Sequence, residues 1–311
     1  MNEMSRRRFM AAVVAAGAAL PLTGFADSAK GKKTKICVFS KHLQWLDYDG
    51  MARTAADIGF DSVDLTVRPG GHVLPERVED DLPRAVEAMK KAGLPPLMMT
   101  TAINDPDDPV TEKILKTASA LGIRYYRMGY FRYADDKSIT QTLAEIKPKM
   151  KALAEMNKHF KIHGAYQNHS GSKYFGSPVW DIWEVIKDLD PAYMGCQFDI
   201  RHATVEGGTS WAIHLRLLAR YIKTRVAKDF VWAHEKDKWK VKNCPLGQGM
   251  VNFDAYMAMS KKLVIAAPFS LHFEYPLGGA EHGKRKLTVD KSVVINAMRR
   301  DLGYLRKVLS A

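Results

Sequence analysis

An acidic residue and a histidine stand three positions apart in the stretch GCQFDIRHATVEGG, residues 195–208. Asp199 and His202 lie at the end of the strand-like run 194–200, and two glycines then release the chain into a new segment. A carboxylate and an imidazole at the end of a buried strand are costly unless they have polar partners. The carboxyl ends of parallel strands are where α/β proteins build their sites. The stretch therefore predicts a functional site, and the alternative is an Asp that caps a helix beside a loop His.

Polar side chains follow six of the predicted strands in the same way. Each one alone is a weak signal, but packing does not require them, and each costs about 1–3 kcal/mol if it is buried without a partner. Together they predict a site at one end of the strands. In chain order they are Lys41, His42 and Trp45; Asp64, Arg68 and His72; Gln167, Asn168 and His169; Asp199 and His202; Lys228 and Asp229; His272 and Glu274.

Three of these side chains have the chemistry of metal ligands. Gln167, Asp199 and Glu274, with one imidazole, suit a divalent cation such as Mn²⁺, Mg²⁺, Co²⁺ or Zn²⁺. Such an ion would polarise a sugar carbonyl or hydroxyl and help to stabilise an enediolate. The alternative is a site without an ion, in which Asp199 pairs with Arg201 or Lys228.

Proton transfer needs a base and a group that stabilises the developing charge. Glu274 ends the last predicted strand in LHFEY, where it shares a face with His272. We predict Glu274 as the base, with His169 and His202 as the other candidates. Lys228, in the seventh predicted strand, is predicted to stabilise an oxyanion or to act as the acid.

Aromatic and cationic side chains near the strand ends are predicted to hold the substrate. The aromatic ones would stack on a sugar ring, although core filling is the more frequent use of such residues. No glycine-rich phosphate fingerprint precedes a helix, so the sequence indicates no phosphate site. The predicted substrate contacts are Lys41, His42, Trp45, Arg68, Tyr166 and Trp232.

The elements that position these residues alternate along the chain. Each of eight strand-like segments is followed by one with helical spacing of apolar residues. Eight such units in about 280 residues fit a closed (β/α)8 TIM barrel, and we predict one over residues 31–311, with a loop at 233–251 over its mouth. The predicted strands are 36–40, 62–67, 97–102, 125–129, 161–168, 194–200, 224–232 and 269–274, and the predicted helices are 48–59, 82–92, 110–121, 139–160, 179–189, 212–221, 253–263 and 289–308.

A separate segment precedes the barrel. Arg6, Arg7 and Arg8 come before an alanine-rich run at 10–20, and Ala26 offers a cleavage point. This pattern is typical of a twin-arginine signal peptide, predicted over residues 1–30, and it predicts export to the periplasm. The run is too short to span a bilayer as a lasting anchor, and we expect no stable membrane anchor once the signal is cleaved. The alternatives are an uncleaved, tethering signal and a cytoplasmic protein with a basic amphipathic start.

Composition narrows the class of partner. The formal net charge of +13 favours anionic surroundings or ligands. Because the lysines and arginines are scattered over many predicted helices without a nucleic-acid motif, we expect no nucleic-acid partner. The three cysteines form no Cys-x-x-Cys, which argues against a thiolate zinc site. Oligomerisation is left open.

Several motifs give the chain a resemblance to a known family. They are GFDSVDLTVRPGGHV, YQNHSG, QFDIRHATVEGG, AKDFVW, PLGQG and the terminal Glu274. On these motifs the chain, over residues 35–308, resembles the xylose isomerase-like TIM barrels, also called the sugar phosphate isomerase/epimerase family. The resemblance implies an enzyme in which a Glu on strand five, an Asp on six, a His on seven and a Glu on eight hold a metal. It also implies that the two Glu move a proton.

Two positions depart from that pattern. Gln167 stands where the resemblance implies Glu, and Val226 stands where it implies His. Glutamine can coordinate a metal through its carbonyl oxygen, but it cannot act as a carboxylate base. The departures therefore favour chemistry with a single base. The missing imidazole would have to come from another histidine, namely His169, His202, His234 or His272.

Three functions fit these patterns, all with a small carbohydrate as partner. The first is an exported sugar isomerase or epimerase that moves a proton next to a carbonyl through an enediolate. The second is a lyase that eliminates the aglycone from a 3-keto-glycoside, which needs one base, an oxyanion stabiliser and an acid. The third is a barrel that binds a carbohydrate without turning it over. Export favours unphosphorylated sugars and glycosides.

Overall fold

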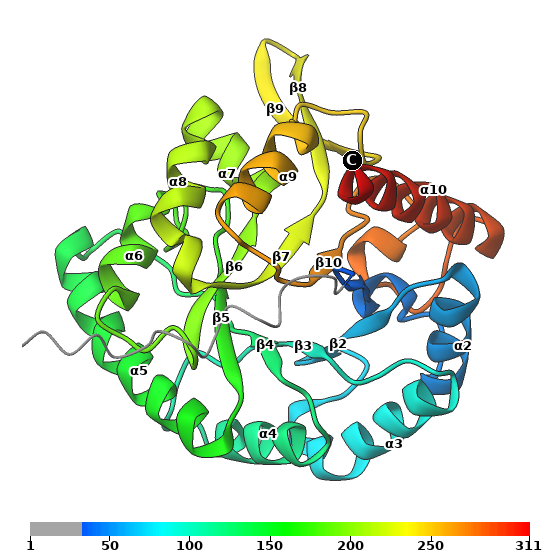
Figure 1. The fold of residues 1–311 in the computed structure, drawn as a ribbon, viewed down its shortest axis with the longest axis horizontal. Coiled ribbons are helices and arrows are strands. Elements are labelled where there is room, and N and C mark those ends of the chain that lie inside the picture. The colour runs from blue at the N-terminus through cyan, green and yellow to red at the C-terminus, as the bar shows by residue number, and fades with distance from the viewer. Residues whose placement is uncertain (1–32) are drawn as a thin grey trace, which may run out of the picture. The chain divides into compact units, whose positions relative to one another are not determined.

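The structure, a computed structural model, describes residues 33–311, so the predicted signal peptide lies outside the described residues. Eight parallel strands close into a barrel in the order β1-β10-β7-β6-β5-β4-β3-β2 (Figure 1). This confirms the predicted (β/α)8 barrel. The strands are β1 (Ile36–Phe39), β2 (Ser62–Val67), β3 (Met98–Thr101), β4 (Tyr125–Arg127), β5 (His163–Gln167), β6 (Met194–Asp199), β7 (Ile222–Ala227) and β10 (Phe269–Leu271).

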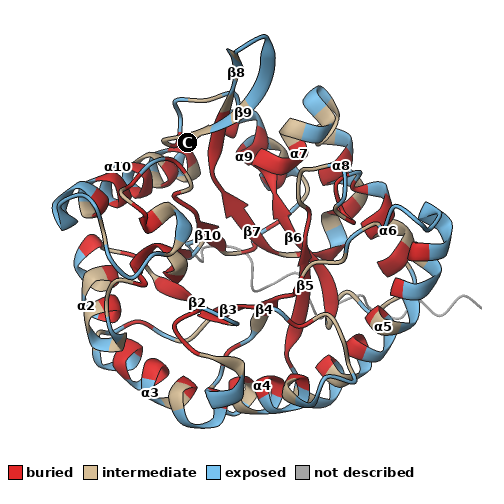
Figure 2. Cartoon of the chain, turned by 180° about the vertical axis from the view of Figure 1, so that it is seen from behind, coloured by how far each residue is buried: buried red, intermediate tan, exposed pale blue. Residues whose placement is uncertain are grey.

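Helices surround the barrel and turn their buried faces toward the strands (Figure 2). Between residues 33 and 311, no helix has the length and hydrophobicity needed to cross a membrane. The helices are α2 (Tyr48–Ile58), α3 (Val78–Lys91), α4 (Pro109–Ala120), α5 (Ile139–Phe160), α6 (Trp180–Ile186), α7 (Ile200–Gly207), α8 (Trp211–Leu218), α9 (Phe253–Lys262) and α10 (Lys291–Ser310).

Local sequence signals set the ends of the helices. The side chain of Asp47 accepts a hydrogen bond from the Gly50 N–H at the start of α2. Gly59 ends that helix with φ 102°, a left-handed conformation that glycine adopts without strain. At the start of α5, Ser138 and Gln141 cap each other's backbone N–H groups. Local chemistry of this kind explains why α5 begins at the predicted residue.

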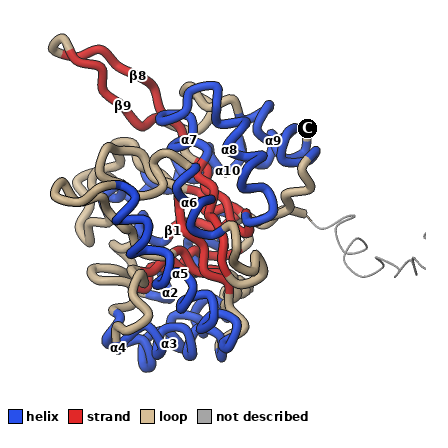
Figure 3. The backbone as a smooth tube through the Cα atoms, turned by 90° about the vertical axis from the view of Figure 1, so that its left-hand side faces the viewer, coloured by secondary structure: helices blue, strands red, loops and turns tan. Residues whose placement is uncertain are grey.

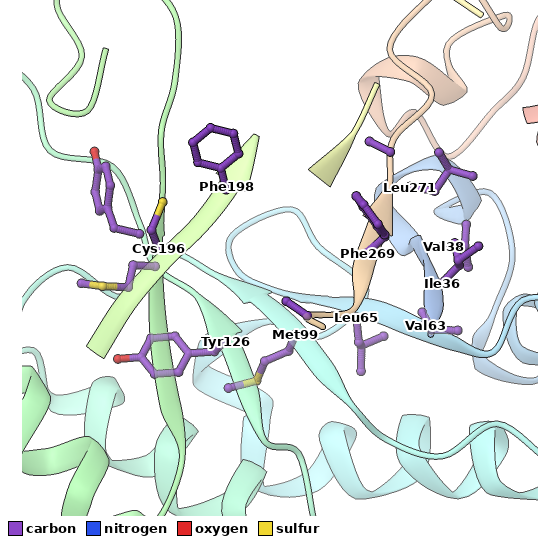
Figure 4. Close-up of a cluster of buried hydrophobic side chains, with 14 of the residues drawn as sticks. Ile36, Val38, Val63, Leu65, Met99, Tyr126, Cys196, Phe198, Phe269 and Leu271 are labelled. Carbon is purple, nitrogen blue, oxygen red and sulfur yellow. The ribbon is translucent and has the colours of Figure 1, made fainter. Parts of the chain in front are cut away.

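Strand parity decides which side chains reach the barrel interior. Alternate residues of each strand point outward, where Val38, Leu65, Phe198 and Leu271 are buried against the helices (Figure 4). The intervening residues point into the barrel. Asp64 is one of them, and its carboxylate accepts hydrogen bonds from the Thr100 and Ser270 hydroxyls. The site residues at the carboxyl ends belong to this inward set.

The seventh predicted strand is wrong in its second half. The barrel strand β7 stops at Ala227, and the chain continues as β8 (Asp229–Glu235), which pairs with β9 (Lys238–Cys244) in an antiparallel hairpin that projects from the barrel (Figure 3). The predicted loop at 233–251 is therefore strand over 233–235 and 238–244. Asp229 fixes the break, because its carboxylate accepts N–H bonds from Gly247, Gly249 and Val251 and folds that loop back onto the strand end.

A further helix, α7, follows β6 directly and was not predicted. The Asp199 side chain accepts a hydrogen bond from the His202 N–H at 3.1 Å and caps this helix. The capping alternative for Asp199 is therefore confirmed. His202 lies in the first turn of α7 rather than in a loop, and this position holds its ring beside the Asp199 carboxylate.

Candidate active site

Four side chains from four strand ends meet at the mouth of the barrel. Gln167 ends β5, Asp199 ends β6, Lys228 follows β7, and Glu274 follows β10. They are joined by hydrogen bonds and ion pairs of 2.7–3.1 Å. The structure thus brings together the three predicted metal ligands and the predicted oxyanion stabiliser.

The Lys228 ammonium lies at the centre of this group. Its Nζ is 3.1 Å from Asp199 Oδ2, 3.1 Å from Glu274 Oε2 and 2.8 Å from His202 Nε2. The lysine side chain is only 4% exposed, so these contacts are its main compensation for lost hydration. The pairing of Asp199 with Lys228, the alternative to a metal ligand, is present. Arg201 instead donates to Ser170 Oγ and Asn243 Oδ1.

Glu274 is held between two lysines. Its Oε1 is 3.1 Å from Lys41 Nζ, and its Oε2 faces Lys228. Burial alone would raise the pKa of Glu274, but the charges of Lys228 and Lys41 outweigh it, so the pKa lies well below its usual value. Its side chain is 23% exposed, whereas that of Asp199 is fully buried. Glu274 is therefore the ionised carboxylate that a substrate can reach.

Gln167 is oriented by two residues that the sequence analysis missed. Its Nε2 donates to Asp199 Oδ2 at 2.7 Å, while its Oε1 accepts from the Tyr130 hydroxyl at 2.6 Å and from Arg127 Nη1 at 3.2 Å. The amide oxygen therefore faces the end of β4 rather than the carboxylates. An arginine inside the predicted strand 125–129, in YYR, was the available signal.

The residues at the mouth do not fit a divalent metal. Across the described residues 33–311, no three His, Cys, Asp or Glu side chains are grouped so that they could hold an ion. The one ligand oxygen of Gln167 is engaged elsewhere, Val226 offers no donor, and the lysine ammonium lies between the two carboxylates. The donor set fits a fixed ammonium ion.

Two histidines lie beside this cluster. His202 Nδ1 accepts from the Ser170 N–H and from Arg201, and its ring lies 4.1 Å from that of His169. Burial, reinforced by Lys228, lowers the pKa of His202 well below its usual value and that of His169 to about 4. Both rings are neutral at pH 7. Because both ring nitrogens of His202 already have polar partners, His202 is less well placed for a base than Glu274.

Four of the predicted substrate contacts do not reach the cluster. His42 is buried between the Ala280 carbonyl and the Phe273 N–H, which occupy both ring nitrogens. Trp45 donates to the His42 carbonyl and lies under Lys291. These two predicted roles are corrected, because the turn after β1 packs their rings against the β10–α10 connection.

The other two aromatic predictions fail for different reasons. Tyr166 is one position from Gln167, so it points out of the barrel, where its hydroxyl donates to the Phe175 carbonyl and its ring is fully buried. Trp232 lies on the projecting hairpin, 39% exposed, with its ring against Phe230. Lys41 and Arg68 remain at the mouth.

Comparisons with known proteins agree with this architecture. The family profile described as "Xylose isomerase-like TIM barrel" matches residues 52–288, more than half of the chain. A search of curated proteins finds no significant match.

Several solved structures share the fold at low identity. A D-psicose 3-epimerase from Clostridium cellulolyticum H10, solved with D-tagatose, has a TM-score of 0.68 at 13% identity, over 88% of this chain and 99% of that chain. A 3-keto-D-glucoside 4-epimerase from E. coli has a TM-score of 0.63 at 13% identity, over 88% and 100%. A probable 3-DHS dehydratase from Bacillus anthracis has a TM-score of 0.64 at 14% identity, over 89% and 99%.

Proposed function

The chain belongs to the xylose isomerase-like TIM barrel family, and on that premise we propose that it is a sugar isomerase or epimerase that moves a proton next to a carbonyl. One observation carries the proposal: a reachable carboxylate, Glu274, is held between the ammonium groups of Lys41 and Lys228 at the barrel mouth. The same arrangement contains a base and two cationic donors, which are the groups that enolisation requires.

The two lysines keep one negative charge between them throughout the reaction. At the start the charge is on Glu274. When Glu274 takes a proton from the carbon next to the carbonyl, the carboxyl becomes neutral and the electron pair of the C–H bond moves to the carbonyl oxygen as an enediolate. Lys228 and Lys41 then stabilise that oxygen, and return of the proton to a carbon completes the exchange. The cations that make Glu274 a weak base in the free enzyme thus lower the barrier.

A second candidate is elimination from a 3-keto-glycoside. It is favoured because Gln167 provides no second carboxylate and Asp199 is buried in its pair with Lys228. Elimination needs one base and one acid, and Glu274 and Lys41 would supply them. The fold shared with a 3-keto-glucoside epimerase and a dehydratase supports both candidates.

Solvent deuterium exchange tests the proposed function. Purified protein is incubated in D₂O with a panel of ketohexoses, aldohexoses and 3-keto-glycosides, before and after treatment with EDTA, and labelling is read by NMR. We expect deuterium next to the carbonyl of one sugar class, at a rate that EDTA does not lower. Release of an aglycone would select the lyase, and C–H bonds left unlabelled across the panel would select a non-catalytic carbohydrate-binding barrel. Loss of labelling with EDTA, restored by Mn²⁺ or Co²⁺, would reinstate the predicted metal.

We also propose that the protein is exported to the periplasm by the twin-arginine route. Replacing Arg6 and Arg7 with lysine should leave the precursor in the cytoplasm, because the export machinery reads that pair. Cell fractionation and immunoblotting measure the distribution, with an unrelated periplasmic protein that carries no twin-arginine signal as the control. An unchanged periplasmic yield would contradict this route.

A further inference from the structure

The barrel mouth carries more positive than negative side chains. Two carboxylates, Asp199 and Glu274, contact cations there directly, and Asp64 lies deeper, bonded to hydroxyl groups. The cations at and around the cluster are Lys41, Arg68, Arg127, Arg201 and Lys228. Because like charges crowded at one place repel each other, the excess is stabilised when an anion binds.

Arg68 is the cation of this set that lacks an acceptor. Lys41 and Lys228 pair with Glu274, while Arg127 and Arg201 donate to side-chain oxygens. Among the residues the structure describes, nothing accepts a hydrogen bond from the guanidinium of Arg68, although the residue is half-buried. Burial, together with the charge of Arg127, lowers the pKa of Arg68 to about 10, so the group stays charged at pH 7.

The position of Arg68 links it to the proposed base. Arg68 follows the last residue of β2, and its guanidinium carbon lies 5.4 Å from the centre of the Phe39 ring. Lys41 Nζ lies 5.5 Å from the same centre, and it is bonded to Glu274. His272 stacks on that ring at 4.3 Å and is itself neutral. A small sugar with one end at Glu274 therefore has its other end within reach of Arg68.

We infer that the substrate is an anionic sugar whose acidic group is bound by Arg68 while its reacting carbon meets Glu274. The inference rests on the proposed function and specifies its substrate class. A guanidinium offers two parallel N–H donors that match a carboxylate, so a sugar acid is the favoured form. A phosphate ester shares this chemistry, and the sequence has no glycine-rich cradle for it.

Matched hexoses test the inference by binding alone. D-glucuronate, D-glucose 6-phosphate and D-glucose differ only at C6, where they carry a carboxylate, a phosphate and a neutral hydroxyl; D-galacturonate and D-gluconate extend the acid set. Isothermal titration calorimetry at fixed ionic strength gives the Kd of each. We expect at least one sugar acid to bind about 10–100-fold more tightly than glucose, the range of a charge-assisted hydrogen bond.

Substitution of Arg68 tests whether this residue causes the preference for the acid over glucose. Arg68→Met should bring the Kd of the acid close to that of glucose without changing the Kd of glucose, and Arg68→Lys should keep part of the preference. Arg84→Met, an exposed arginine on α3, is the control and should leave all values unchanged. Equal binding of acids, phosphate and glucose by the wild type, or a preference that survives Arg68→Met, would overturn the inference.

The remaining outcomes separate this inference from the proposed function. If the wild type prefers the phosphate and Arg68→Met loses that preference, Arg68 is an anion site, but the substrate is not a sugar acid. Tight acid binding through Arg68 without any deuterium exchange would support the anion site and contradict the proposed enzyme. Deuterium exchange confined to neutral sugars would support the proposed enzyme and contradict the anionic substrate.

Discussion

Replacing Glu274 with glutamine is expected to lower turnover about 10²–10⁴-fold, the usual cost of losing a general base, while the barrel stays folded. Glutamine keeps the shape of glutamate, and its single amide oxygen can still accept a hydrogen bond from one of the two lysines, Lys41 or Lys228. It cannot accept a proton from carbon. Because the side chain is 23% exposed at the mouth, the substitution leaves no fully buried charge without a partner.

The measurement compares turnover and deuterium exchange in the wild type and in Glu274→Gln, with a thermal unfolding curve for each. Glu145→Gln, an exposed glutamate paired with Lys137 on the barrel surface, is the matched control. Wild-type turnover in Glu274→Gln would remove Glu274 from the mechanism and move the base to His169 or His202. A loss of stability without a loss of turnover per folded molecule would make Glu274 a structural residue.

The pH profile gives an independent check on the base. The lysines hold the pKa of Glu274 well below 4.5, and a base loses activity only as the pH falls through its own pKa in the folded protein. Turnover should therefore show no acid limb assignable to Glu274 between pH 7 and pH 5. An acid limb within that window that persists in Glu274→Gln would identify a different titrating group.

The barrel was predictable because its signals are local. Alternating strand and helix segments, helix caps and glycine ends each depend on a few neighbouring residues, and the start and end of α5 match the prediction. The break after Ala227 was not predictable in this way. The run 224–232 contains no glycine or proline that would mark a break, and β7 ends there because Asp229 binds backbone groups about twenty residues further along the chain.

Most charged residues at the barrel mouth were predicted, with the exception of Arg127, whereas the aromatic residues predicted there lie elsewhere. Strand ends locate Asp199, Lys228 and Glu274 at one mouth, since parallel strands share that edge. Parity along β5 was sufficient to place Tyr166 opposite to Gln167 and so outside the barrel. The sequence alone does not say which oxygen of a side chain faces which donor. Only the structure shows that the amide oxygen of Gln167 faces Arg127 and that the ammonium of Lys228 lies between the carboxylates.

Replacing Lys228 with methionine should have a large effect on both stability and activity. Removing one partner of a buried ion pair leaves an uncompensated charge, which costs about 3–5 kcal/mol in the free energy of unfolding. Methionine fills a similar volume, so the loss reports the charge rather than a cavity. Turnover should fall about 10²–10³-fold, since a donor to the developing oxyanion is lost.

A second substitution separates the charge of Lys228 from its chemistry. Adding Asp199→Asn to Lys228→Met removes the carboxylate that was left unpaired, so much of the lost stability should return while turnover stays low. Lys187→Met, which breaks a surface pair with Glu184, is the control and should change the free energy of unfolding by no more than about 1 kcal/mol. Recovery of turnover together with stability in the double variant would reduce Lys228 to a structural counter-ion.

The Lys228→Met variant also decides between the ammonium and the metal that was predicted from the sequence. In the wild type, Nζ lies between Asp199, Glu274 and His202, so added Mn²⁺, Co²⁺ or Zn²⁺ should leave the unfolding midpoint unchanged. Without the ammonium, the two carboxylates and the imidazole would have room to move together around an ion, and metal at about 100 times its Kd should restore roughly 2.7 kcal/mol. Metal retained by the purified wild type, with a midpoint that rises on metal addition, would mean that the ion displaces the ammonium. No shift in either protein would mean that Lys41 and Gln167 are sufficient to hold the carboxylates, and that the site has no place for a second cation.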